Sequence, residues 1–245
     1  MIEILTIGLT SVAAGVIQSV TGFGAAVILM LVVPLFFDMV AAPALASAIT
    51  LGLSTTLAWK FRRHIDWRIG LLPTAVYLLF SLVLIRVAKQ MQTDVLAFGF
   101  GIFLIFLALF FFFFSQKITL RGSWLSACVC ATISGITSGL FGTGGPLMAI
   151  YFVSTTKSKE SYIANLQFLF ASTNIINLIA RISNGIYTPD LIPMTLLGIL
   201  GITLGKRFGL KILDRIDPAL TKKLVYGFIG ISGLITVIQQ AQKLF

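Results

Sequence analysis

Residues 138–149 read Ser-Gly-Leu-Phe-Gly-Thr-Gly-Gly-Pro-Leu-Met-Ala and place four glycines and one proline inside a long apolar run. That run covers residues 123–153. As a straight helix rising about 1.5 Å per residue, it would be longer than the roughly 30 Å hydrocarbon core of a bilayer. A second overlong run, residues 4–37, is interrupted by Gly22 and Gly24. Because glycine allows sharp backbone turns, both runs are predicted to break into two shorter helices.

The composition predicts that the whole chain lies in a membrane. Of its 245 residues, 58% are hydrophobic and 11% are charged, whereas soluble domains carry about 25% charged residues. Apolar segments recur at residues 4–37, 39–59, 69–87, 95–114, 123–153, 161–180, 191–205 and 224–238. We therefore expect an all-α membrane protein with one polytopic domain over residues 1–245. The net charge of +10 comes from Lys and Arg clusters between these segments, which is typical of a bilayer topology signal and not of nucleic-acid binding.

The two interrupted runs occupy corresponding positions of an internal duplication. A shift of the sequence by 120 positions places Gly15 on Gly135, Gly22 on Gly142, Gly24 on Gly144 and Pro73 on Pro193. The order of one long and three ordinary apolar segments also repeats, as expected of a duplicated unit. We divide the chain into repeat one, residues 1–119, and repeat two, residues 120–245.

The distribution of basic residues favours one topology. If each long run is a re-entrant hairpin, the links at 60–68, 115–122, 154–160 and 206–223 share one side and hold 14 of the 18 Lys and Arg residues. Short cytoplasmic loops are enriched in these residues. The pattern thus predicts two inverted repeats, each a hairpin plus three transmembrane helices, in the cell (inner) membrane with both termini outside. The alternative is eight plain transmembrane helices, for which the charges divide almost evenly.

A break in a membrane helix indicates a cavity, because unpaired backbone groups inside a bilayer need partners from protein or water. The second half-helix starts just after the glycines, so its free N–H groups and positive dipole end face the break. Pro146 suits such a first helical turn. Inverted repeats bring two of these helix starts together near the midplane, where we expect them to bind an anion without any buried Arg or Lys. Close helix packing is the alternative role for the glycines.

The candidate substrate-binding residues lie at the two breaks and on the helix that follows the second one. They are Gln18, Ser19, Thr21, Gly22, Gly24, Ser138, Gly142, Thr143, Gly144, Gly145, Asn174 and Asn177. Residues Gln167, Asn174, Asn177 and Arg181 share one helical face. Arg181 is expected at the outer mouth, where it either attracts anions or extends to lipid headgroups.

The acidic residues all lie near segment ends or in links, so no mid-span carboxylate is available to couple transport to a proton or cation. We expect potential-driven export of an anion by a uniport mechanism. The spans hold no Ser-His or Asp-Asp constellation and no metal-ligand cluster. The chain is therefore predicted to have no catalytic residues, no metal and no cofactor, and not to be an enzyme.

At these glycine motifs the chain resembles a known family. Residues 15–24 (GVIQSVTGFG) and 135–146 (GITSGLFGTGGP) are similar to the paired signature of the sulfite exporter TauE/SafE permeases. The resemblance implies transport of a small sulfur-containing anion such as sulfite or a sulfonate. Phe23 stands where the second motif has Thr143, so the first hairpin is expected to be the weaker half of the site. An anion channel and a membrane scaffold without transport activity stay open as alternatives, and the sequence gives no oligomeric state.

Overall fold

The computed structural model describes residues 2–114, 123–212, 230–231 and 233–242. The described residues form helices, short 3-10 turns and connecting loops, and contain no β-strand. In chain order the elements are α1 (Ile2–Thr21), α2 (Ala25–Val32), η1 (Val33–Leu35), α3 (Ala42–Lys60), η2 (Arg62–His64), α4 (Trp67–Gln90), α5 (Thr93–Phe114), α6 (Trp124–Phe141), α7 (Gly145–Thr155), α8 (Lys159–Ser183), η3 (Pro189–Leu191) and α9 (Ile192–Ile212). Residues 233–242 form a further helical segment.

Seven of the described helices are long and apolar enough to cross a membrane, namely α1, α3, α4, α5, α6, α8 and α9. Large apolar side chains point outward from them, for example Leu79 at 62% exposed, Phe112 at 75% and Leu200 at 65%. Such surfaces suit lipid and not water, which confirms the expectation of an all-α membrane protein. The predicted segment 224–238 lies partly outside the described residues, as do link 115–122 and residues 213–223 of the last link.

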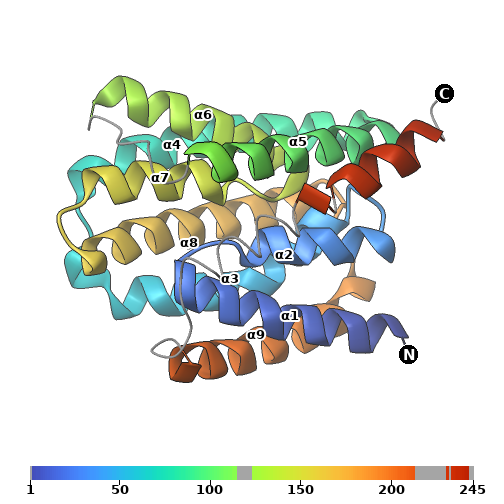
Figure 1. Cartoon of the computed structure of the whole chain (residues 1–245), viewed down its shortest axis with the longest axis horizontal. Coiled ribbons are helices and arrows are strands. Elements are labelled where there is room, and N and C mark those ends of the chain that lie inside the picture. Colours follow the sequence, from blue (N-terminus) through green and yellow to red (C-terminus); the bar gives the residue numbers. More distant parts are fainter. Residues whose placement is uncertain (1, 115–122, 213–229, 232, 243–245) are drawn as a thin grey trace.

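Both overlong runs break at the predicted glycines. α1 ends at Thr21 and α2 begins at Ala25, while α6 ends at Phe141 and α7 begins at Gly145. In Figure 1, α2 runs back towards the end of the molecule that holds the N-terminus, and α7 runs back towards the start of α6. In each broken run the first helix is longer than the second. α1 has 20 residues and α2 has eight, while α6 has 18 and α7 has 11.

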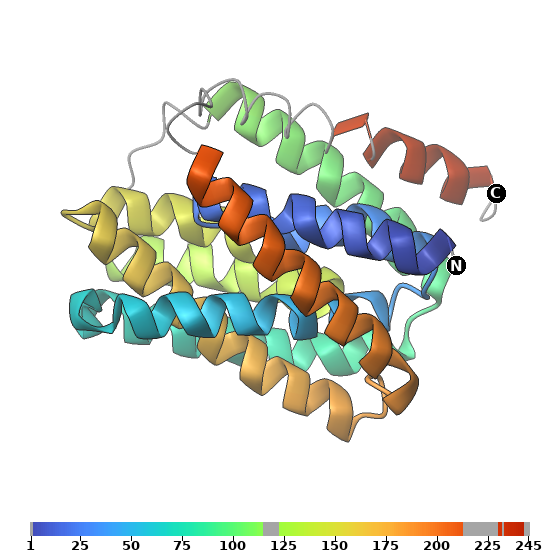
Figure 2. The same ribbon diagram turned by 90° about the horizontal axis from the view of Figure 1, so that it is seen from below.

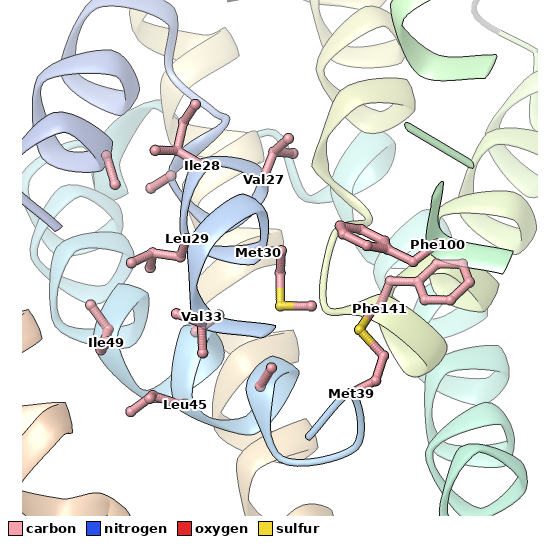
Figure 3. Close-up of a cluster of buried hydrophobic side chains, with 14 of the residues drawn as sticks. Val27, Ile28, Leu29, Met30, Val33, Met39, Leu45, Ile49, Phe100 and Phe141 are labelled. Atoms are coloured by element: carbon pink, nitrogen blue, oxygen red, sulfur yellow. The ribbon is translucent and has the colours of Figure 1, made fainter. Parts of the chain in front are cut away.

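The short helices α2 and α7 pack inside the bundle. Residues 27–30 of α2 are at most 7% exposed, and Met148 and Phe152 of α7 are fully buried. Figure 3 shows the α2 side chains among those of α3, with Phe100 and Phe141 nearby. A helix of eight residues is not stable by itself in water, so contacts with the surrounding helices must hold α2 in place.

Close glycine contacts join α1 to α9. A Cβ atom added to Gly201 of α9 would lie 2.8 Å from the carbonyl oxygen of Gly8, and one added to Gly209 would lie 3.0 Å from the Cα of Val16. The residue numbers rise together on both helices, so α1 and α9 run in the same direction. Figure 2 shows α9 lying across α1. Small residues allow this close approach of two membrane helices.

A second parallel pair, α4 and α6, is built in the same way. Gly135 of α6 lies against the backbone of Tyr77 on α4, and Gly139 lies against Ser81 one turn further along. Both glycines lie where an added side chain would meet the neighbouring backbone. They therefore set the distance between α4 and α6.

The helices α3 and α8 pack against each other inside the bundle. The buried share of the span is 61% in α3 and 44% in α8, against 50% in α6. Asn174 of α8 donates a hydrogen bond to the hydroxyl oxygen of Thr50 on α3, at 3.3 Å. In Figure 1 the two helices run in opposite directions along the long axis.

The helix α5 packs against residues 233–242. A Cβ added to Gly101 would lie 2.8 Å from Val237, and one added to Gly233 would lie 2.8 Å from Leu104. The number on one helix rises as the number on the other falls, so the two segments are antiparallel.

The connections between helices divide between the two ends of the bundle. The link from α3 to α4 and the link from α7 to α8 lie at one end in Figure 1. The N-terminus, the link from α4 to α5 and the link from α8 to α9 lie at the other end. The basic residues of η2 and the basic start of α8 therefore lie at the same end of the molecule.

Candidate functional site

Each break places the start of a helix inside the bundle. The backbone angle φ is 82° at Gly22, 101° at Gly24 and 69° at Gly142, a region that favours glycine. No described side chain caps α2 after Gly24 or α7 after Gly144. By contrast, side chains cap the starts of α4, α6 and α8, namely Asp66, Ser123 and Ser158. The start of α3 has no side-chain cap either. The first N–H groups of α2 and α7 are thus left without a side-chain acceptor.

The two breaks come together although they are far apart in the sequence. A Cβ added to Gly145, at the start of α7, would lie 3.8 Å from the Cβ of Phe23 in the first break. The same position lies 3.0 Å from the ring of Phe170 on α8. The start of α7 therefore lies against Phe23 of the first break and against Phe170 of α8.

Neutral groups surround the first break. Gln167 of α8 donates from its side-chain nitrogen to the carbonyl oxygen of Gly22, at 2.7 Å. The Tyr162 hydroxyl donates to the carbonyl oxygen of Thr21, at 3.2 Å. The Thr21 hydroxyl itself donates to the carbonyl oxygen of Phe23, at 2.6 Å. These bonds satisfy carbonyls that the end of α1 leaves free.

The second break is packed tightly against α4 and α6. The Cα of Gly144 faces the carbonyl oxygen of Ser134 and the hydroxyl of Tyr77, with no room for a side chain. Thr143 is 1% exposed, and its hydroxyl has no hydrogen-bond partner among the described residues. A buried hydroxyl without a partner costs about 1–3 kcal/mol.

Comparison with known protein families identifies the family of the chain. Residues 7–236 match the family model described as "Sulfite exporter TauE/SafE". The chain belongs to the TauE/SafE family. The resemblance predicted from the two glycine motifs is thereby confirmed, and the family is one of membrane transporters and not of enzymes. The comparisons with curated proteins and with solved structures gave no match.

In this TauE/SafE protein, several predicted residues meet beside the second break. The Asn177 side chain accepts a hydrogen bond from the Ser81 hydroxyl at 2.8 Å and donates to the Ser138 hydroxyl at 3.5 Å. Asn174, one turn earlier on α8, reaches Thr50 of α3 instead. Amides inside a membrane protein face protein or a cavity, and both of these point to the centre of the TauE/SafE bundle.

The predicted residues of α1 divide between two places. Gln18 is 4% exposed and donates to the side-chain oxygen of Gln167 at 3.5 Å, which connects it to the first break. Ser19 lies apart from the break. Its hydroxyl donates to the carbonyl oxygen of Gly15 at 2.6 Å, and its side chain faces Gly209 of α9.

Arg181 is not at an outer mouth, because the structure buries this cation inside the bundle at the end of α6. The residue is 1% exposed. Its guanidinium donates to the carbonyl oxygens of Ser138 at 3.2 Å and Gly139 at 3.1 Å, at the C-terminal end of α6. The C-terminal end of a helix carries partial negative charge and attracts cations. The Ser138 carbonyl also accepts from the N–H of Gly142 at 2.9 Å, so the guanidinium adds a second bond there and turns inward instead of extending to lipid headgroups.

Sequence reasoning missed polar residues that the fold brings to the breaks. Tyr77 and Ser81 of α4 lie beside the second break, and Tyr162 of α8 lies beside the first. The available signal was the pair Tyr77 and Ser81, two polar residues four apart in the mostly apolar segment 69–87. In the part of the chain that the structure describes, no three His, Cys, Asp or Glu side chains gather as metal ligands.

Proposed function

We propose that this TauE/SafE protein is a secondary transporter that exports a small sulfur-containing anion, such as sulfite or a sulfonate. The anion binds where the two glycine breaks meet. The observation that carries this proposal is the pair of uncapped helix starts inside the bundle, together with the unpaired hydroxyl of Thr143 beside one of them.

The physical basis is the partial positive charge at a helix N-terminus. It is equivalent to roughly half an elementary charge and is accompanied by free N–H donors. In a low-dielectric interior such donors interact more strongly with an anion than they do in water. Broken helices that place their starts at the centre of an inverted-repeat carrier form substrate sites in this way.

The same proposal includes two inverted repeats, residues 1–119 and 120–245, within a single membrane domain. The packing supports it. Gly22 lies against Tyr162 near the start of α8, and Gly142 lies against Pro43 near the start of α3. The shift of 120 positions takes Gly22 to Gly142 and takes Tyr162 to position 42, one residue from Pro43, so the two contacts correspond. The parallel pair α1–α9 likewise corresponds to the parallel pair α6–α4.

The antiparallel pairs support the inverted relation as well. Helices α3 and α8 occupy equivalent places in the two repeats, and they pack against each other in opposite directions. The segment 233–242 packs against α5 in the same antiparallel manner. A two-fold axis in the membrane plane produces such contacts between equivalent elements.

We predict that links 60–68, 115–122, 154–160 and 206–223 are all cytoplasmic. In a background with Cys128 and Cys130 replaced by alanine, the single substitutions Thr119→Cys and Lys157→Cys should react with a membrane-impermeant thiol reagent only from the cytoplasmic face. Labelling of the two positions from opposite faces would show that the α6–α7 run crosses the membrane and that the chain has eight plain spans.

Export follows from the charge of the substrate. The buried polar residues of the described chain include no Asp or Glu, so none is available to bind a coupling proton or cation. A cytosol held negative drives an anion outward by about 2.3 kcal/mol per charge per 100 mV. We therefore propose uncoupled export across the cell (inner) membrane, with both termini outside.

Flux in proteoliposomes tests this function. We expect saturable efflux of sulfite or a sulfonate that an inside-negative potential accelerates. A current that grows linearly with concentration would indicate an anion channel instead. Absence of flux for every small anion tested would leave only a non-transport role such as a scaffold.

Replacement of Thr143 by valine is expected to weaken anion binding without destabilising the fold. Valine keeps the shape of the side chain and removes the unpaired hydroxyl, so thermal stability in detergent should stay equal or rise. The loss of a hydrogen bond to a charged ligand should weaken apparent anion affinity by about tenfold. Unchanged affinity in a folded Thr143→Val protein would remove this hydroxyl from the site.

A further inference from the structure

The two breaks differ in their charge balance. Each break joins the C-terminal end of one helix to the N-terminal end of the next. The partial charges at these ends are about −0.5 and +0.5. The helix starts still offer N–H donors to an anion, but the two dipole ends together leave little net charge at either break. The side chains around each break therefore decide the sign of its net charge.

At the first break, the partners of the free carbonyls are neutral. Gln167 and Tyr162 donate to Gly22 and Thr21. The position that corresponds to Arg181 under the shift of 120 is Phe61. No cation among the described residues donates a hydrogen bond to the carbonyls of this break.

At the second break, the carbonyl partner is a full positive charge. Arg181 donates from one guanidinium nitrogen, Nη2, to the last turn of α6. The described buried residues include no acidic side chain that could neutralise it. Its Nε atom is buried and has no hydrogen-bond partner among the described residues. Since the end of α6 offsets about half a charge, the region keeps a net positive charge.

Polar side chains connect this charge to the start of α7. The Tyr77 hydroxyl, which faces Gly144, lies close to the side chains of Ser138 and Thr173. Ser138 in turn contacts Asn177, which lies one turn before Arg181 on α8. An isolated buried charge is costly unless a counter-charge accompanies it. An anion at the start of α7 would provide that counter-charge.

Resting on the proposed function, we propose that Arg181 supplies the net positive charge of the transport site. The anion therefore binds at the second break, and doubly charged anions are preferred over singly charged ones. The first break closes the site on the other side but carries no charge of its own. Arg181 thus sets the valence preference, in addition to holding the end of α6.

Valence preference is the measurement that distinguishes this role from helix capping alone. The probes are sulfite at alkaline pH, where it is a dianion, and methanesulfonate, a monoanion. The two anions compete for uptake into proteoliposomes that have no membrane potential, and the uptake rates give the apparent affinity for each. Removal of one nearby charge by Arg181→Gln should lower the ratio of dianion to monoanion affinity by about tenfold or more. Arg181→Lys should restore most of the ratio.

Asn177→Asp tests the same charge without removing the arginine. It places a carboxylate one turn from Arg181 on the same helix face, which should neutralise the guanidinium and lower the ratio while the bonds to α6 persist. Arg86→Gln is the matched control, because it removes an exposed cation near the end of α4 and should leave the ratio unchanged.

The outcomes distinguish failure of the proposed function from failure of the role proposed for Arg181. If the unmodified protein transports neither probe, the proposed function fails and this inference fails with it. If it transports them but Arg181→Gln and Asn177→Asp both keep the ratio of the unmodified protein, Arg181 is only a helix cap. If Arg181→Gln does not fold, Arg181→Lys and Asn177→Asp decide the question.

Discussion

Substitution of Gly144 by valine is expected to abolish anion flux. The added Cβ would meet the carbonyl oxygen of Ser134 and the hydroxyl of Tyr77. The Ser134 oxygen belongs to the backbone of α6, which cannot turn aside as the end of a side chain can, and α6 packs on α4 at Gly135 and Gly139. The start of α7 must shift instead, which separates its N–H groups from the site. We expect flux to fall at least a hundredfold, as a loss of about 3 kcal/mol in substrate positioning produces.

The measurement is sulfite efflux from proteoliposomes, paired with a melting curve of the variant in detergent. From the sequence, Gly144 is expected to face the substrate, so that valine blocks the site without affecting the fold. The structure shows it packed against protein, so the melting temperature is also expected to fall. Phe112→Trp on the exposed face of α5 is the control and should retain full flux. Normal transport by Gly144→Val would place the anion away from the start of α7.

Substitution of Gly205 by leucine is expected to prevent folding. The Cβ position of Gly205 overlaps the backbone carbonyl of Val12 on α1, and backbone atoms cannot move aside as the end of a side chain can. Leucine would separate α1 from α9 along the whole contact between Gly8 and Gly209. The cost exceeds the 1–3 kcal/mol typical of overpacking and approaches the marginal stability of a protein domain, about 5–15 kcal/mol.

The yield of monodisperse protein after detergent extraction measures this effect. We expect Gly205→Leu to aggregate or to be degraded. Gly52→Leu is the matched control, because no atom lies within 4 Å of a Cβ added at that position, and it should yield as much folded protein as the unmodified chain. A stable, monodisperse Gly205→Leu protein would mean that α1 does not pack on α9 as described.

The sequence by itself determined that the chain lies in a membrane, that it is helical, and where the two breaks fall. These features depend on local chemistry. An apolar run of sufficient length requires a helix in a bilayer, and Gly142 to Pro146 cannot continue a helix without interruption because their backbone preferences favour a turn and a new helix start. The 120-residue repeat and the family resemblance could also be recognised from the sequence, since both depend on the order of residues alone.

Only the tertiary structure decided which side chains surround the breaks. Ser19 and Gln18 are neighbours on α1, yet one faces α9 and the other reaches Gln167. From the sequence, Arg181 is expected at the outer mouth, but its hydrogen bonds to the carbonyls at the end of α6 make the interior favourable for it. Helix breaks follow from each residue's own conformational preferences. A hydrogen bond between Arg181 and Ser138 depends on two helices packing together, and no local preference contains that information.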